Sequence, residues 1–124
     1  MIQCRLDFPK NLPGIPLSAE TRHNIFLAFE EALANTLKHS GASQVTAEMT
    51  SQNGMFVISI ADNGCGFNVE TQIQATERGK GGHLGLSGMY DRLRTIGGEC
   101  QITSSPGRGT IVKFILPRFK TNAR

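Results

Sequence analysis

The sequence lacks the features that define several classes of protein. It has no tryptophan and one tyrosine, and aromatic residues make up 6% of its 124 residues. It has no run of about 18 apolar residues, so we expect no direct insertion into a membrane. The first residues lack the charged start and apolar stretch of a secretion signal. These absences favour a protein that works in the cytoplasm.

Cysteine and excess charge are also scarce. The three cysteines are far apart, odd in number and without a C-x-x-C pair, which indicates reduced thiols rather than a disulfide framework or a zinc site. The formal net charge of +3 is too small for a nucleic-acid-binding surface, and no aromatic stacking surface accompanies it. A few cations would suit a phosphate ligand, but they would equally suit an ordinary solvated surface.

The composition that remains is that of a globular chain, with 39% hydrophobic and 19% charged residues. A length of 124 residues fits one domain that can bury a core without disulfides or metals. We therefore expect a single domain over residues 1–124.

The first half of the chain shows three regular segments. Residues 2–8 alternate between apolar and polar, as in a half-buried strand. Ser18 is a candidate N-cap for a helix from about Ala19 to His39, and Gly41 would end that helix. Asn53-Gly54 then separates two alternating runs, which is the pattern of a tight β-hairpin.

The second half predicts a helix and a further hairpin. Residues 68–82 are polar and poorly periodic, which indicates either a functional lid or a disordered loop. A helix is expected over residues 84–96, ended by Gly97-Gly98, and strands over 99–104 and 110–116. Hairpins separated by helices favour an α+β fold, a two-layer sandwich whose mixed, mostly antiparallel sheet has helices on one face.

The first helix combines a core-facing stripe with a polar edge. At about 100° per residue, Glu31, Asn35 and Lys38 fall within roughly 60° of one another. An amide oxygen suits Mg²⁺, a carboxylate can orient or deprotonate a nucleophile, and a lysine can meet phosphate charge. A solvated helix flank would look the same. The expected stripe consists of Ile25, Phe29, Leu33 and Leu37, flanked by Phe26 and Ala32.

Three glycine-containing segments are the other candidates for a ligand site. Residues 62–66 place a carboxylate at a strand exit, followed by two glycines that would let a flat ligand approach, although a plain turn has the same composition. Residues 79–89 lead a glycine-rich chain into a helix start, as in a phosphate-binding loop or a flexible linker. Residues 107–110 form a glycine turn between strands.

Taken together and in this order, these segments resemble the ATP-binding domain of the histidine kinases, within the group that also contains gyrase, the Hsp90 chaperones and MutL. The resemblance covers residues 17–117. Its Glu-Ala-Leu-x-Asn, Lys-His-Ser and Gly-Leu-x-Gly-Met pieces are most similar to the subgroup of the nitrate sensor and DesK-like kinases. The residues that carry it are Glu31 to Asn35, Lys38 to Ser40, Asp62 to Phe67, Gly85 to Met89 and Gly107 to Thr110.

The resemblance implies the Bergerat-type ATP-binding fold and a role for each motif. Asn35 would coordinate Mg²⁺ on the ATP phosphates, Glu31 would be the catalytic polar residue, and Lys38 and His39 would approach the phosphates. The adenine base would lie against a wall that includes the Asp62 carboxylate. Residues 68–82 would be the lid. Asp62, Gly64 and Gly66 would form the base wall, with Thr110 at the adenine end, and Gly85, Leu86 and Gly88 would contact the phosphates. Phe67, Gly82 and His83 would also border the nucleotide, although His83 would fit the flank of the lid equally well.

The implied reaction transfers the γ-phosphoryl group of ATP to a histidine on a separate dimerisation and phosphoacceptor segment, which this chain lacks. His23 is expected to be an ordinary helix residue and not that acceptor. The isolated chain should then be a monomer that binds ATP or ADP with little autokinase activity. The complete protein would be a membrane-bound bacterial sensor with this domain in the cytoplasm and a response regulator downstream.

Two alternatives remain open from the sequence. A serine kinase of the anti-sigma type shares a Glu-Ala-x-x-Asn helix and glycine motifs. A degenerate regulatory domain would bind nucleotide without catalysis.

Overall fold

The computed structural model describes residues 3–7, 18–39, 41–52, 55–71 and 86–116, with the side chains of 3–7, His39, Ser51, Gln52 and Ser87 excepted. A helical turn at 69–71 opens the segment that the sequence predicted to be irregular. The main elements, in chain order, are β1 (Gln3–Asp7), α1 (Ala19–His39), β2 (Gln44–Gln52), β3 (Met55–Asp62), α3 (Leu86–Thr95), β4 (Glu99–Ser104) and β5 (Thr110–Leu116).

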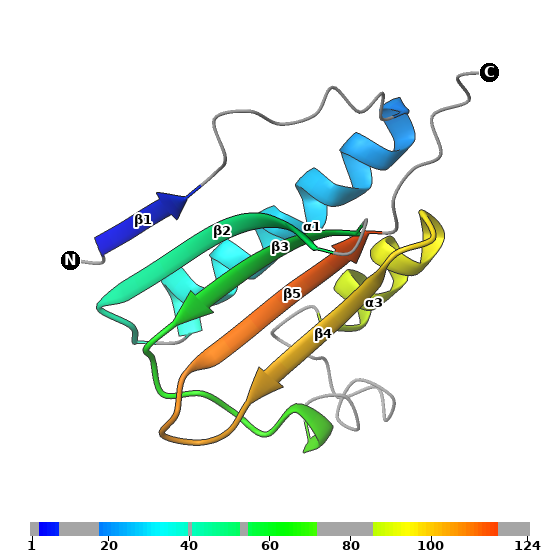
Figure 1. Cartoon of the computed structure of the whole chain (residues 1–124). Coiled ribbons are helices and arrows are strands. Elements are labelled where there is room, and N and C mark those ends of the chain that lie inside the picture. The colour runs from blue at the N-terminus through cyan, green and yellow to red at the C-terminus, as the bar shows by residue number, and fades with distance from the viewer. Residues whose placement is uncertain (1–2, 8–17, 40, 53–54, 72–85, 117–124) are drawn as a thin grey trace.

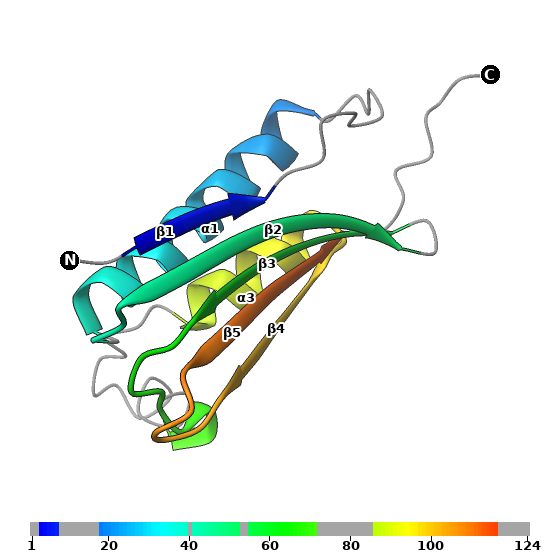
Figure 2. The same cartoon turned by 60° about the vertical axis from the view of Figure 1, so that its left-hand side comes forward.

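The strands form one mixed sheet in the order β1-β2-β3-β5-β4. The β1–β2 pair is parallel, and the β2–β3, β3–β5 and β4–β5 pairs are antiparallel. Helices α1 and α3 lie side by side on one face of this sheet (Figures 1 and 2). The predicted α+β two-layer sandwich, with a mostly antiparallel sheet and helices on one face, is confirmed. Among the helices described, none is long and apolar enough to cross a bilayer.

Helix α1 has the bounds that its sequence signals predicted. The Thr21 amide donates to Ser18 Oγ at 3.0 Å, so Ser18 is the N-cap. Gly41, whose φ is 66°, follows the end of the helix in a conformation that favours glycine. The helix buries a face of small residues: Thr21, Ala28, Ala32 and Thr36 are all at most 9% exposed.

The predicted apolar stripe of α1 was wrong at two positions. Leu37 is 63% exposed and Phe26 is 59% exposed. Ile25, Phe29 and Leu33 pack against the core but are only partly buried. The centre of the buried face is therefore rotated away from the large side chains and toward the alanines, since small residues allow the closer approach.

Helix α3 ends just before Gly97-Gly98, as the sequence predicted. The Gly98 amide donates to the Leu93 carbonyl at 2.8 Å and the Gly97 amide to the Arg94 carbonyl at 3.0 Å. With Gly97 at φ 79°, this is the Schellman pattern. Ile96 lies in the turn rather than in the predicted helix. Leu86, Met89 and Leu93 enter the core, each at most 4% exposed.

Both predicted hairpins form. Gln52 pairs with Met55, so two residues connect β2 and β3, although the Asn53-Gly54 turn itself lies outside the described residues. Ser104 pairs with Thr110 across the loop 105–109. The core between the sheet and the helices is built from alternate strand residues and the buried helix faces: Val45, Ala47, Ile58, Ile60, Val112, Phe114 and Leu116 from the sheet, and Ala28, Ala32, Leu86, Met89 and Leu93 from the helices.

Candidate functional site

One row of side chains crosses the sheet at the end where β3 finishes. Asp62 pairs with Thr110 of β5, and Thr110 pairs with Ser104 of β4. Residues directly opposite one another on neighbouring strands project from the same face. Thr36 of α1 contacts Asp62, so this face is the one that the helices cover. A carboxylate and two hydroxyls thus line the helix-covered end of the sheet.

The Asp62 carboxylate is held in place at both oxygens. The Gly64 amide donates to Oδ1 at 2.8 Å, and the Thr36 hydroxyl lies 3.2 Å from Oδ2. The same hydroxyl lies 3.3 Å from the Ala32 carbonyl, an interaction within α1. Sequence analysis missed Thr36, which is 3% exposed. A lone threonine gives no signal in the sequence, because only the packing of α1 places its hydroxyl beside Asp62.

Gly64 and Gly66, the two glycines that follow Asp62, have different structural roles. Gly64 supplies the amide just described. Gly66 has φ 68°, and a Cβ there would come within 2.1 Å of the Ser105 carbonyl oxygen. A Cβ on Gly109 would likewise come within 2.3 Å of the Asp62 carbonyl oxygen. The loop after β3 and the loop after β4 therefore touch backbone to backbone at two glycines, which fixes Asp62 relative to Thr110.

Asn63 ties the same loop to the start of β2. Its Oδ1 accepts hydrogen bonds from the amides of Ser43 and Gln44, at 2.9 and 3.0 Å. Its Nδ2 donates to Ser43 Oγ at 3.0 Å. The Asn63 side chain thus caps the start of β2, while the neighbouring Asp62 carboxylate faces the helices.

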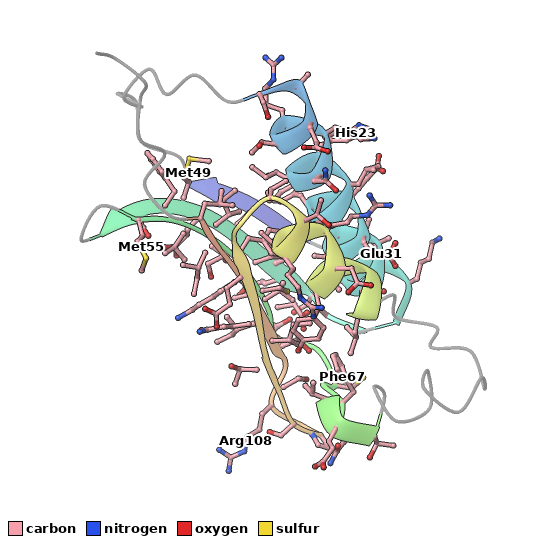
Figure 3. All side chains as sticks on the ribbon, turned by 90° about the vertical axis from the view of Figure 1, so that its right-hand side faces the viewer. His23, Glu31, Met49, Met55, Phe67 and Arg108 are labelled. Carbon is pink, nitrogen blue, oxygen red and sulfur yellow. The ribbon has the colours of Figure 1, made fainter. Side chains whose placement is uncertain are left out.

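Helices α1 and α3 enclose a groove of about 200 Å³. Glu31 of α1 and Gly88 of α3 both line it, which brings together two residues that the sequence placed in separate motifs. Arg92, which sequence analysis did not single out, lies one turn beyond Gly88. Figure 3 shows Glu31 on the side of α1 that adjoins α3. The groove is lined by Leu27, Glu30, Glu31, Gly88, Met89 and Arg92.

The rest of the polar edge of α1 continues from this groove toward the carboxylate. Asn35 is half-buried, one turn after Glu31 and directly before Thr36, and Lys38 is exposed. His23 is exposed on the outer side of α1 (Figure 3). In the described part of the chain no three acidic, histidine or cysteine side chains gather as a metal site. A single amide ligand fits Mg²⁺ only when phosphates and water complete its octahedral shell.

Two predicted site residues have side chains that are buried to different extents. Leu86 is 4% exposed, and Phe67 packs against the core cluster (Figure 3). A ligand would therefore meet the backbone of Leu86 rather than its side chain, whereas the side chain of Phe67 is still partly accessible. Gly82, His83 and Gly85 lie outside the described residues, as does the side chain of His39.

This architecture defines a known class of nucleotide-binding domain. The histidine kinase domain of a blue-light activated kinase from Erythrobacter litoralis superposes with a TM-score of 0.72 at 22% identity, covering 94% of this chain and 52% of that one. The ATP binding domain of PrrB from Mycobacterium tuberculosis superposes with a TM-score of 0.69 at 27% identity, covering 96% and 82%.

Residues 20–120 match the family described as histidine kinase-, DNA gyrase B- and HSP90-like ATPases. The chain belongs to this family, and within it the domain is of the type found in sensor histidine kinases.

Two relatives are bacterial sensor proteins of larger size. The chain is 34% identical to the sensor protein VraS of Staphylococcus haemolyticus over 76% of its own length and 25% of that protein. It is 30% identical to the sensor histidine kinase LiaS of Bacillus subtilis over 92% and 30%. The chain thus spans less than a third of these relatives. They do not favour the serine-kinase or degenerate alternatives, and the nitrate-sensor subgroup stays a prediction.

Proposed function

We propose that this chain binds ATP and supplies the catalytic site of a two-component sensor histidine kinase, and that the complete protein transfers the γ-phosphoryl group to a histidine on its dimerisation segment. The observation that carries the proposal is the Asp62 carboxylate, fixed by Thr36 and Gly64 on the helix-covered end of the sheet. Membership of the ATPase family supports the proposal that the ligand is ATP.

The base end of the proposed site is the row of Asp62 and Thr110. Thr110 is 8% exposed and Asp62 is half-buried, so a ligand there would be largely shielded from water. An ionised carboxylate only accepts hydrogen bonds, and it therefore selects a base that donates one, as the exocyclic amine of adenine does.

The phosphate end lies along the polar edge of α1 toward the start of α3. The side of Gly88 on which a Cβ would stand has no atom within 4 Å, so phosphate oxygens could approach the backbone there. Lys38 would contribute positive charge, and Asn35 would hold the Mg²⁺. When bound, this ion would neutralise the phosphate charge during transfer. His39 and the glycines before α3, Gly82 and Gly85, are assigned to the phosphate end from the sequence resemblance alone.

Glu31 is the proposed catalytic residue because it lines the groove that opens between α1 and α3. An acceptor imidazole entering this groove would meet the Glu31 carboxylate, which can accept a hydrogen bond from the ring and orient its other nitrogen toward the γ-phosphorus. Phosphoryl transfer needs mainly positioning and charge neutralisation, and these residues can supply both.

The partners follow from the same proposal. The acceptor histidine belongs to the dimerisation segment of the same receptor, and a response regulator takes the phosphoryl group from it. The isolated chain is a cytoplasmic monomer that binds ADP or ATP without phosphorylating itself.

Calorimetric titration of the 124-residue chain with ADP, ATP and GDP, with and without Mg²⁺, tests the proposal. We expect saturable binding that favours adenine nucleotides, with Mg²⁺ tightening ATP. No binding at about millimolar nucleotide, a free energy of roughly −4 kcal/mol, would refute a nucleotide site in this chain.

Two variants assign the ends of the site. Asp62→Ala should weaken ADP by at least tenfold, about 1.4 kcal/mol, while inorganic triphosphate binds as before. Asn35→Ala should remove the effect of Mg²⁺ on ATP affinity and leave the fold unchanged by circular dichroism. Equal losses of ADP and triphosphate in Asp62→Ala would move this residue away from the base.

A further inference from the structure

The Ser104 hydroxyl joins four parts of the chain around the base end of the site. The Phe67 amide donates to Ser104 Oγ at 2.9 Å, which links the loop after β3 to the end of β4. Ser104 Oγ lies 3.0 Å from the Gly109 carbonyl oxygen and 2.8 Å from Thr110 Oγ1. No sequence motif used above includes Ser104, yet it is the direct neighbour of Thr110 across β4 and β5.

The single proton of the Ser104 hydroxyl fixes the direction of its hydrogen bonds. A serine hydroxyl has one proton to donate and can accept two hydrogen bonds. A carbonyl oxygen only accepts, so the proton of Ser104 goes to Gly109, and the Phe67 amide fills one acceptor position. The remaining contact then requires Thr110 to donate its own proton to Ser104. The hydroxyl of Ser104 is fully used in this arrangement.

The direction of the Thr110 bond decides what Thr110 offers to a ligand. With its proton committed to Ser104, Thr110 Oγ1 presents lone pairs alone, and its neighbour Asp62 also presents lone pairs alone. A base with an amine at this edge can donate to such a surface, directly or through water. Guanine, which has a carbonyl oxygen at that position, would place an acceptor against acceptors.

We infer that Ser104 is a positioning residue for base selection: it holds the Thr110 hydroxyl as an acceptor, and this excludes guanine nucleotides. The inference rests on the proposed adenine-nucleotide site. Ser104 acts through Thr110 and touches no ligand itself. Without Ser104, the Thr110 hydroxyl can rotate and donate to a guanine carbonyl, so selectivity should weaken even where the fold is kept.

The test is the ratio of GDP to ADP dissociation constants, measured by calorimetry. In Ser104→Ala we expect this ratio to fall by about 5- to 10-fold, the size of one neutral hydrogen bond. Ser105→Ala is the matched control, because Ser105 is the next residue and is exposed, and it should keep the ratio of the unaltered chain. Ser104→Thr restores the hydroxyl and should restore the ratio. If Ser104→Ala does not fold by circular dichroism, Ser104→Cys, whose thiol is a weak partner, should give a smaller fall.

A double variant separates this role from general loosening of the loops. Thr110→Val removes the hydroxyl on which Ser104 acts, so adding Ser104→Ala to it should change the ratio no further. A ratio in Ser104→Ala equal to that of Ser105→Ala, or a further fall in the Thr110→Val background, would overturn the inference while ADP binding keeps the proposed function. Failure of the unaltered chain to bind ADP would overturn both.

Discussion

At the scale of single residues, the Asp62 carboxylate depends on one partner that is far from it in sequence and on one that is close to it. Thr36 contacts it from α1, and Gly64 contacts it from its own loop. The motif around Asp62 was readable in the sequence because glycines cluster after a strand. Thr36 and Ser104 were not, because a lone threonine or serine carries no signal until the pairing of strands and the packing of α1 place it beside a motif.

Thr36→Val tests this dependence by removing a hydroxyl while keeping the shape of a buried side chain. We expect ADP affinity to fall about 3- to 10-fold, since a hydrogen bond to a charged group contributes on the order of 1 kcal/mol or more. Thr50→Val, at an exposed position of β2, is the control and should bind ADP normally. Calorimetry gives both values, and inorganic triphosphate should bind all three chains alike. Unchanged ADP affinity in Thr36→Val would show that Gly64 alone orients the carboxylate.

At the scale of elements, local signals predicted the helices and hairpins well. Ser18 and Gly41 bounded α1, and Gly97-Gly98 ended α3, because caps and left-handed glycines act within a few residues. The face that α1 buries was not predictable in the same way. Phe26 and Leu37 fitted the helical period, but the fold leaves both exposed and buries Ala28 and Ala32 instead.

Gly88 of α3 allows binding and stability to be tested against each other. A Cβ at Gly88 meets no atom within 4 Å, so Gly88→Ala should stabilise the helix by about 0.5–1 kcal/mol through propensity. The added methyl group would stand where phosphate oxygens are proposed to lie, so ATP affinity should fall. Thermal unfolding and calorimetry measure the two effects.

Gly97→Ala is the matched control for that experiment. Gly97 has φ 79°, so the same change should lower the unfolding temperature through backbone strain and leave ATP affinity unchanged. If Gly88→Ala is more stable and binds ATP as before, Gly88 does not border the phosphates.

At the scale of the whole molecule, the two cysteines with described side chains report different events. Cys65 is exposed, whereas Cys100 is 7% exposed in the core beneath α3. Burial, and to a lesser extent the neighbouring Glu99 charge, raises the pKa of the Cys100 thiol to about 12. The reactive thiolate of Cys100 is therefore suppressed at neutral pH, and alkylation should require the domain to open.

Iodoacetamide at pH 8, followed by peptide mass spectrometry, should label Cys65 at least tenfold faster than Cys100, a difference of about 1.4 kcal/mol or more in opening free energy. Saturating ADP should slow Cys100 further by stabilising the folded state. Equal labelling rates in the absence of denaturant would show that the core opens far more readily than its burial implies.

The raised pKa of Cys100 also gives a dependence of stability on pH. Its contribution to folding is complete below the ordinary thiol pKa of 9.0 and is lost as the pH rises toward about 12. We expect the free energy of unfolding, measured with denaturant, to decrease across this alkaline range. A flat profile would show that the thiol does not stay protonated in the folded domain.

The strand order has a consequence for synthesis of the protein. β5, one of the last described elements, lies between β3 and β4, and it carries Thr110 to the side of Asp62. A nascent chain that ends before β5 contains α1 and the loop after β3 that carries Asp62, but it lacks Thr110. Because β5 follows the other described strands in the chain, the proposed base wall can be completed only after β5 has been synthesised. Nucleotide binding at this proposed wall would therefore stabilise chains that contain β5 and leave shorter chains unaffected.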